Sequence, residues 1–361
     1  MHARTARDVL DVRAGFASVH AAARLQNNDP AGRVCKRLHR VKTRIWSVTV
    51  ASSKATLSGL RVGWIGAGRM GYSMAKRLLD AGCDLSVYNR TRSKAEPLAE
   101  YGGKIVDTPK DLCDRDIVFT MVSASNDLIE VTFGPQGVLT ADKKPQLLVD
   151  CSSVSEEASA EVRSRAAKIG VEMLAAPVSG NAKVVKAGKL TIVASGPKAS
   201  FDQAEPYLEA IGRGVTYVGE GELARMVKIC HNLLLGVVTQ CLAEIVVLAN
   251  KGGVPRHATL DFINNSVMGS MFSRYKTPAF VNLDMTPTFT PELLRKDLDL
   301  GLKAGKALGV PLPVTELTRA LVDATVKGGY EGKDFAVLLL EQAKKSGLKL
   351  EPENVDVGTG L

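Results

Sequence analysis

The residues best suited to proton transfer are Lys228 and Asn232, in the stretch GEGELARMVKICHN (219–232). Four residues apart on a helix, they share one face, a turn apart. The apolar run LLLGVVTQCLAEIVVLAN follows, so an ammonium group here is costly unless its charge is used or paired. Desolvation lowers a lysine pKa and makes the ammonium a better proton donor near neutral pH. We therefore predict that Lys228 is a general acid/base that Asn232 helps to hold; the alternative is a lysine that reaches solvent at the start of its helix.

A glycine-rich loop, GAGRMG (66–71), is the second chemical signal. It lies between a strand expected at 61–65 and a helix expected at 70–81. Gly66 permits a tight turn, Gly68 lets the backbone approach a pyrophosphate, and Gly71 allows helix and strand to pack closely. The free N–H groups of the helix N-terminus then face the phosphates. We predict a dinucleotide site that includes Arg69 and Met70, although such a loop can also be purely structural.

The end of the second expected strand indicates which dinucleotide binds. An NAD site usually has an acidic residue there for the ribose 2′-hydroxyl. This chain has Asn89-Arg90-Thr91-Arg92-Ser93 instead. Guanidinium groups form forked, charge-assisted bonds to phosphate. The corner favours NADP over NAD, and NAD stays possible if the segment is only a solvated basic turn.

Strand and helix patterns alternate up to residue 218 and then give way to helices. Repeated βα units predict an α/β fold, a Rossmann-type, doubly wound, mainly parallel sheet. Its strands are expected at 61–65, 84–89, 104–106, 117–122, 147–150, 172–176, 190–194 and 215–218, with a helix at 93–101. Later helices are expected at 223–251, 256–264, 291–308, 314–327 and 334–345. We predict an NADP-binding domain over 59–221 and a helical substrate and oligomerisation domain over 222–361.

Charge separates residues 1–58 from the rest of the chain. Of the net charge of +9, residues 1–60 carry eleven Lys or Arg and three Asp, which leaves the remainder close to neutral. A basic groove for nucleic acid is therefore not expected. The extension has scattered Arg and no Glu, typical of a mitochondrial or plastid transit peptide. The alternative is a functionless tail from an upstream start codon, which would favour a cytoplasmic protein.

Cysteine spacing and hydropathy limit the remaining classes. The six cysteines form no CxxC pair and no metal-ligand spacing, so reduced thiols and no metal site are expected. Gln240 and Glu244 interrupt the longest apolar run, 233–249, so no membrane span is expected. A helix that is apolar all round must be buried in a core or against another subunit.

Four motifs in order resemble the β-hydroxyacid dehydrogenase family, most closely its 3-hydroxyisobutyrate dehydrogenase branch. They are GWIGAGRMGYSMAKRLLDAG (63–82), DCSSVS (150–155), APVSGN (176–181), and GEGELARMVKICHN (219–232) with the later RKDLDLGL (295–302). The resemblance covers residues 61 to about 350. It implies the same two-part fold, dimers or tetramers, and hydride transfer between NAD(P) and a small β-hydroxyacid or its semialdehyde.

The resemblance also implies roles for individual residues. Lys228 and Asn232 match the catalytic pair. Ser179 and Gly180 match the loop that binds the substrate carboxylate. Asn181 follows in the same loop, where the family often has glycine. Cofactor contacts fall to Val122, Ser123, Ser153 and Lys296. His231 is unusual at its position and is expected to serve packing or hydrogen bonding.

Two other activities remain open. One is NADPH-dependent reduction of glyoxylate or succinic semialdehyde, which the basic corner at Arg90 favours. The other is a non-catalytic dinucleotide-binding scaffold, a class expected to lose the lysine that this chain retains at 228.

Overall fold

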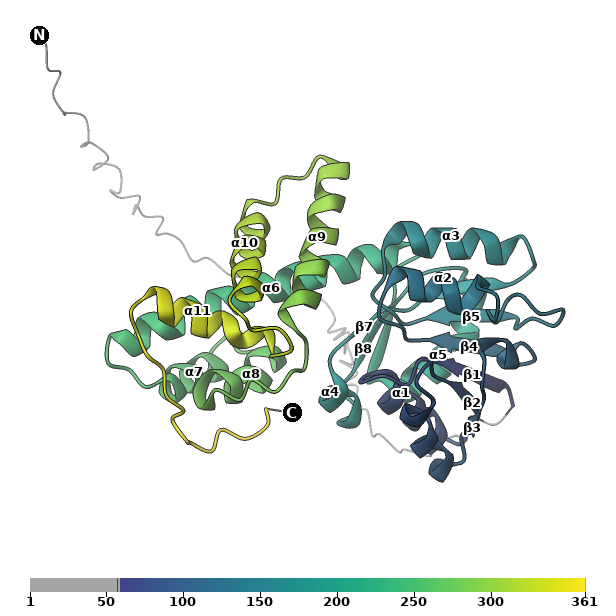
Figure 1. Cartoon of the computed structure of the whole chain (residues 1–361), viewed down its shortest axis with the longest axis horizontal. Coiled ribbons are helices and arrows are strands. Elements are labelled where there is room, and N and C mark those ends of the chain that lie inside the picture. The colour runs from purple at the N-terminus through teal and green to yellow at the C-terminus, as the bar shows by residue number, and fades with distance from the viewer. Residues whose placement is uncertain (1–56, 58, 361) are drawn as a thin grey trace, which may run out of the picture. The chain divides into compact units, whose positions relative to one another are not determined.

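The computed structural model describes Leu57 and residues 59–360. A central sheet of six parallel strands has the order β3-β2-β1-β4-β5-β6 (Figure 1). These strands are β1 Arg61–Ile65, β2 Asp84–Tyr88, β3 Lys104–Ile105, β4 Ile117–Thr120, β5 Leu147–Asp150 and β6 Glu172–Ala175. The order reverses between β1 and β4, and in such sheets ligands bind at this switch point. The predicted Rossmann-type fold is confirmed.

Helices cover both faces of this sheet because its strands are apolar on both sides. Helices α1 (Gly71–Asp80) and α5 (Lys198–Ile211) pack on one face over Trp64 and Val87. Helices α2 (Ser125–Phe133) and α3 (Glu156–Ala167) pack on the other, over Ile65 and Val118 (Figure 1). The glycine loop thus opens at the carboxyl edge of a rigid, two-sided core.

The last expected strands do not extend the main sheet, so that prediction was wrong. Strands β7 (Val178–Ser179), β8 (Thr191–Ala194) and β9 (Gly214–Tyr217) form a separate small sheet. Strand β8 runs antiparallel to β7, with only the five-residue helix α4 (Ala182–Lys186) in the connection. A parallel crossover needs a dozen or more residues, so this short connection turns the chain back. A single bridge, Ala175 to Ser195, joins the two sheets.

The helix expected at 93–101 is instead two short 3₁₀ turns, Arg92–Lys94 and Glu96–Tyr101. Pro97 has no N–H, so it cannot continue a helix begun before it. A further 3₁₀ turn, Pro109–Leu112, precedes β4.

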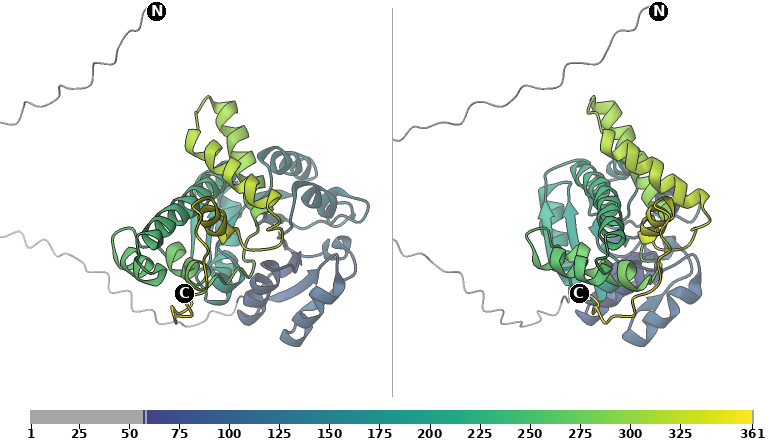
Figure 2. Two further views of the ribbon diagram at one scale, coloured as in Figure 1. Left: turned by 60° about the vertical axis from the view of Figure 1, so that its left-hand side comes forward. Right: turned by 90° about the vertical axis from the view of Figure 1, so that its left-hand side faces the viewer.

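The remaining part of the chain is helical, as expected. Its elements are α6 Leu223–Lys251, α7 Arg256–Asn265, α8 Met271–Asn282, α9 Pro291–Leu308, α10 Pro313–Lys327, a 3₁₀ turn at Phe335–Val337, and α11 Leu338–Lys345. The bounds of α6 and α9 match those predicted. Helix α8 was missed because Pro278 lies inside it. The views in Figure 2 show α9 and α10 lying beside each other.

Helix α6 runs from the sheet into the core of the helical part (Figure 1). One face is buried, with Ala243 and Val246 fully so, while Leu234, Ile245 and Leu248 are exposed. By length and composition alone α6 could cross a membrane, because its most apolar 18-residue stretch has a mean hydropathy of 1.9. Of that stretch, 44% is buried inside the protein. That buried share comes from packing on α9 and α11, as in the core helix of a globular fold.

Candidate active site

The glycine loop has the shape that a pyrophosphate requires. Gly66 has φ +101°, and a Cβ there would lie 2.3 Å from the Met121 carbonyl oxygen. A Cβ at Gly71 would lie 1.8 Å from the Gly66 oxygen, while one at Gly68 would meet nothing within 4 Å. Asn89 Oδ1 accepts a hydrogen bond from the Ala67 N–H at 2.8 Å and holds the loop. The loop is therefore rigid and leaves Gly68 open to a phosphate at the start of α1.

A cavity of about 230 Å³ continues from this loop along the end of β2. Lys94 and Asp127 line it together with seven of the residues predicted to bind the cofactor, which are Gly66, Gly68, Asn89, Arg90, Thr91, Val122 and Ser123. Arg90 Nη1 lies 3.2 Å from Asp127 Oδ1. Arg92 instead pairs with Asp107 and Glu96. Two cations, Arg90 and Lys94, therefore line this cavity at the end of β2.

A larger cavity of about 400 Å³ shares Gly68, Val122 and Ser123 with the first and brings the remaining predicted residues together. The sheet side supplies residues 68–71, Val122, Ser123, Ser153 and residues 179–181; the helical side supplies Lys228, Asn232 and Lys296. Lys296 Nζ donates to the Ser153 carbonyl oxygen at 3.1 Å and so joins α9 to the loop after β5. The glycine loop and the Lys228 side chain therefore line one cavity.

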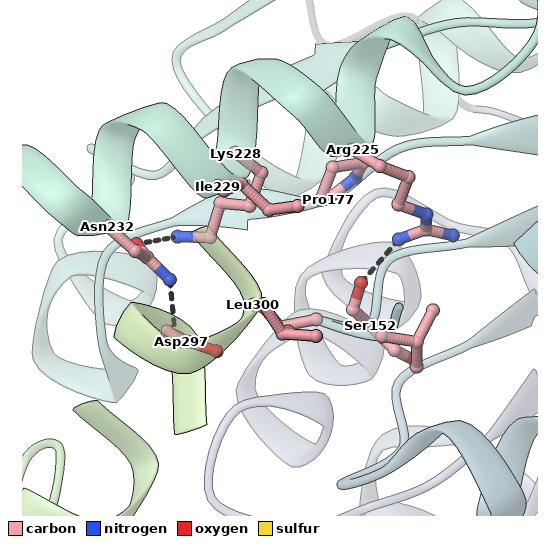
Figure 3. Close-up of a pocket in the computed structure, with 10 residues that line it drawn as sticks. Ser152, Pro177, Arg225, Lys228, Ile229, Asn232, Asp297 and Leu300 are labelled. Carbon is pink, nitrogen blue, oxygen red and sulfur yellow. Dashed lines mark hydrogen bonds between the residues drawn. The ribbon is translucent and has the colours of Figure 1, made fainter. Parts of the chain in front are cut away.

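Lys228 begins a short hydrogen-bond chain that has Asn232 at its centre (Figure 3). Its Nζ donates to Asn232 Oδ1 at 2.9 Å, and Asn232 Nδ2 donates to Asp297 Oδ2 at 2.6 Å. Desolvation by burial is the main cause that lowers the Lys228 pKa; Asp297 partly opposes the shift and Lys296 adds to it, and the resulting pKa is about 8. A lysine with such a pKa exchanges protons close to neutral pH.

A buried ion pair fixes the start of α6 against the sheet. Arg225 pairs with Asp150 at the end of β5, with both side chains almost fully buried. Arg225 Nη1 also donates to the Ser152 carbonyl oxygen at 2.5 Å (Figure 3). Asp150 Oδ1 in turn accepts from Thr120 Oγ1 at 2.6 Å. These contacts hold Lys228, one turn further on, over the cofactor edge of the sheet.

Residues 179–181 form a tight turn between β7 and α4. Gly180 has φ +141°, and a Cβ there would lie 2.8 Å from Val184. Asn181 is buried, and its Oδ1 accepts from the Val184 N–H at 3.1 Å as the N-cap of α4. Ser179 Oγ lies 2.8 Å from His231 Nε2, across the cavity from its own strand. His231 thus makes hydrogen bonds, in line with the expected role.

Several residues of this site were missed in the sequence. Asp297 lies beside Lys296 in the motif RKDLDLGL, and Asp150 and Arg225 lie in the motifs DCSSVS and GELARMVK. The sequence signal that could have revealed them is a charged residue inside each of these motifs. The wall opposite the sheet is apolar and mostly aromatic, formed by Met271, Phe272, Tyr275, Phe289, Leu293 and Phe335. Three of these come from α8, the helix that the sequence did not reveal.

Sequence comparisons place this geometry in a known group. Residues 61–219 match the model for the NAD binding domain of 6-phosphogluconate dehydrogenase. Residues 222–340 match the model for the NAD-binding of NADP-dependent 3-hydroxyisobutyrate dehydrogenase. The chain is 30% identical to a probable mitochondrial 3-hydroxyisobutyrate dehydrogenase of Dictyostelium discoideum, over 79% of this chain and 91% of the relative. It is 26% identical to the chloroplastic glyoxylate/succinic semialdehyde reductase 2 of Arabidopsis thaliana, over 83% of this chain and 84% of the relative.

A solved structure agrees with these matches. The crystal structure of a 3-hydroxyisobutyrate dehydrogenase from Salmonella typhimurium superposes with a TM-score of 0.72 at 26% identity, covering 78% of this chain and 100% of that one. The chain belongs to the β-hydroxyacid dehydrogenase family and is an NAD(P)-dependent oxidoreductase that acts on CH–OH groups.

Proposed function

We propose that the protein interconverts a small β-hydroxyacid and its semialdehyde, as a 3-hydroxyisobutyrate dehydrogenase does, with Lys228 as the general acid/base. The observation that carries this proposal is the Lys228 ammonium group, whose pKa is lowered to about 8, in a cavity shared with the glycine loop and with Ser179. An acid/base group and a cofactor cradle on one cavity are the minimum for carbonyl reduction.

Substrate binding divides between the two sides of the cavity. Ser179 and the backbone N–H groups of the 179–181 turn would hold the carboxylate. The aromatic wall formed by Phe272, Phe289 and Phe335 would take an apolar body, such as a methyl group. Because the Asn181 oxygen is used in capping α4, its side chain shapes the turn and its backbone N–H remains for the substrate.

Proton transfer at the substrate oxygen is the task of Lys228. The bound nicotinamide supplies or accepts the hydride at the substrate carbon. In reduction, Lys228 Nζ gives a proton to the carbonyl oxygen; in oxidation, the neutral amine removes the proton from the hydroxyl. Asn232 keeps Nζ in place through a neutral amide oxygen, so it does not compete for the proton. Lys296, near the junction of sheet and helices, would add positive charge beside cofactor and substrate.

NADP is the proposed cofactor because Arg90 and Lys94 line the cavity beyond β2. Arg90→Ala is expected to raise the KM for NADPH about tenfold while leaving that for NADH within twofold, since a charge-assisted bond contributes about 1.5–3 kcal/mol. Arg92→Ala is the matched control, because Arg92 carries the same charge on the same segment but does not line this cavity. Equal loss with both cofactors would show that Arg90 does not read the 2′-phosphate.

Two further parts of the proposal concern assembly and location. Exposed apolar residues on α6 and α7, among them Ile245, Leu248 and Phe262, support a homodimer or homotetramer. Sedimentation that gives only a monomer at micromolar concentration would contradict it. The transit peptide predicted at 1–58 lies outside the described residues, apart from Leu57; the chloroplastic and mitochondrial relatives support it.

The test of function is turnover of residues 59–361 on a panel of acids and semialdehydes with both cofactors. The panel is 3-hydroxyisobutyrate, methylmalonate semialdehyde, glyoxylate, succinic semialdehyde and tartronate semialdehyde. Preference for the first two supports the proposal. Preference for glyoxylate or succinic semialdehyde with NADPH supports the reductase alternative, which the Arabidopsis relative also favours. Binding of NADPH without any turnover would support the non-catalytic scaffold.

A further inference from the structure

The hydrogen bonds around His231 fix which ring nitrogen carries the proton. Asn232 Nδ2 faces the Asp297 carboxylate at 2.6 Å, so its Oδ1 faces Lys228 and the ring. His231 Nδ1 lies 3.0 Å from this Oδ1. An amide oxygen only accepts, so Nδ1 must carry a hydrogen. The neutral ring then has a bare Nε2.

A bare Nε2 decides the direction of the bond to Ser179. Nε2 lies 2.8 Å from Ser179 Oγ and can only accept, so the hydroxyl donates to it. The single hydroxyl proton of Ser179 is then directed at the ring. In this state Oγ presents lone pairs to the cavity, which disfavours a carboxylate. With a protonated ring, Nε2–H donates to Oγ and the hydroxyl proton is free to turn toward the cavity.

We propose that His231 is a positioning residue that couples substrate binding to proton uptake: the ring takes a proton from solvent when a carboxylate binds at Ser179. Protonation lets the Ser179 hydroxyl donate toward the cavity instead of toward the ring. It also places a positive charge on the ring that Ser179 contacts, beside the bound anion. The inference rests on the proposed function, since it requires an acid as the ligand at this turn.

The charged groups around the ring set the direction of the effect. Lys228 lies on the same helix, Asp297 of α9 contacts Asn232, and Lys296 of α9 and Tyr275 of α8 line the same cavity. Desolvation and the charge of Lys228 lower the pKa of His231, so the ring is neutral near pH 7 when the site is empty. A bound carboxylate would raise that pKa. The acid therefore binds most tightly at a pH below the pKa that His231 has in the empty site. Its affinity falls as the pH rises above that pKa.

The experiment measures proton uptake when 3-hydroxyisobutyrate binds the enzyme–NADPH complex, a combination of two reduced ligands that cannot turn over. Calorimetry in two buffers of different ionisation enthalpy gives the number of protons taken up at pH 7.5. The wild type is expected to take up most of one proton, with Kd rising up to tenfold per pH unit. His231→Gln and Ser179→Ala are each expected to take up much less, with a Kd that depends weakly on pH.

His257→Gln is the matched control, because His257 bonds Glu353 and is the other histidine among residues 59–360. It is expected to behave as the wild type does. NADPH affinity and the melting temperature report whether each variant is folded; two variants on opposite sides of the bond keep the test independent of either one. Uptake in His231→Gln and Ser179→Ala equal to that of the wild type would overturn the coupling while leaving the proposed function intact. No binding or turnover by any acid of the panel would overturn both.

Discussion

Two lysines in the helical part differ in burial and in partners: Lys276 is buried and Lys228 is half-buried. Lys276 of α8 is 3% exposed, and its Nζ meets Asp334 at 2.6 Å and Thr288 Oγ1 at 3.0 Å. It also lies 4.1 Å from the centroid of the Phe335 ring. Lys228 of α6 donates to the neutral amide oxygen of Asn232, and it is the amide nitrogen of Asn232 that bonds the Asp297 carboxylate. A charge neutralised inside the fold is structural, whereas one held by a neutral partner can exchange its proton.

The comparison is sharpest when each lysine is replaced by methionine. Lys228→Met is expected to lower kcat by about 10²–10⁴-fold, the usual contribution of a general acid/base. The cause is the lost proton donor, so NADPH affinity stays within a few-fold. Steady-state turnover and NADPH fluorescence titration measure the two effects. Near-normal kcat in a folded variant would show that another group moves the proton.

Lys276→Met is expected to act on stability. It leaves Asp334 buried without its cation, which costs about 3–5 kcal/mol of unfolding free energy. Urea unfolding measures this loss. The double variant Lys276→Met/Asp334→Leu is the control and should recover much of it, because an apolar pair of similar volume often replaces a buried ion pair without loss. Unchanged stability in the single variant would remove the distinction between the two lysines.

Removing Lys228 is expected to change the free energy of unfolding in the opposite direction, making the fold more stable. Its folded pKa of about 8 lies below the ordinary 10.5, so the fold carries the full cost of the desolvated charge below pH 8. Between pH 8 and 10.5 unfolding takes up a proton, and wild-type stability rises with pH. Lys228→Met should therefore be more stable by roughly 1–3 kcal/mol at pH 7, allowing for solvent screening in the open cavity. Urea unfolding at pH 7 and pH 10 should show the gain shrinking.

The sequence revealed the parts of the fold that depend on local pattern. The glycine loop follows from three glycines placed between a strand and a helix. The bounds of α6 and α9 follow from apolar spacing, with Gly252 after α6 and Pro291 starting α9. Periodicity does not say which sheet a strand joins, which is why β8 and β9 were placed wrongly.

The candidate site could be predicted only where its residues are neighbours in sequence. Lys228 and Asn232 are one helical turn apart, so the pattern reveals them. Asp297 meets Asn232 from 65 residues away, and Ser179 meets His231 from 52 residues away. The first contact depends on how α6 packs on α9, and the second on how α6 packs against β7. No local spacing in the sequence records either of them. The aromatic wall needed α8, whose internal proline hid it.

Two charged residues near Lys228 allow a finer test of whether this lysine is the group that titrates in the reaction. Asp297 raises that pKa and Lys296 lowers it. In the wild type, the rate of oxidation should rise as Lys228 loses its proton, through a pH of about 8. Asp297→Asn should move this rise to lower pH, and Lys296→Met should move it to higher pH, each by less than about one unit, as expected for charges that act partly through solvent.

The pH dependence of kcat for oxidation at saturating substrate and cofactor measures both shifts. Midpoints displaced in opposite directions would show that the titration of Lys228 produces the rise in rate with pH. A purely structural loss in either variant would lower the plateau of the rate without moving the midpoint. Asp323→Asn is the matched control, since Asp323 of α10 pairs with Arg295 of α9 and neither residue lines the cavity. If both variants and the control share the wild-type midpoint, the rise in rate belongs to another group. Lys228 would then be held like Lys276, as a charge the fold carries and the reaction does not use.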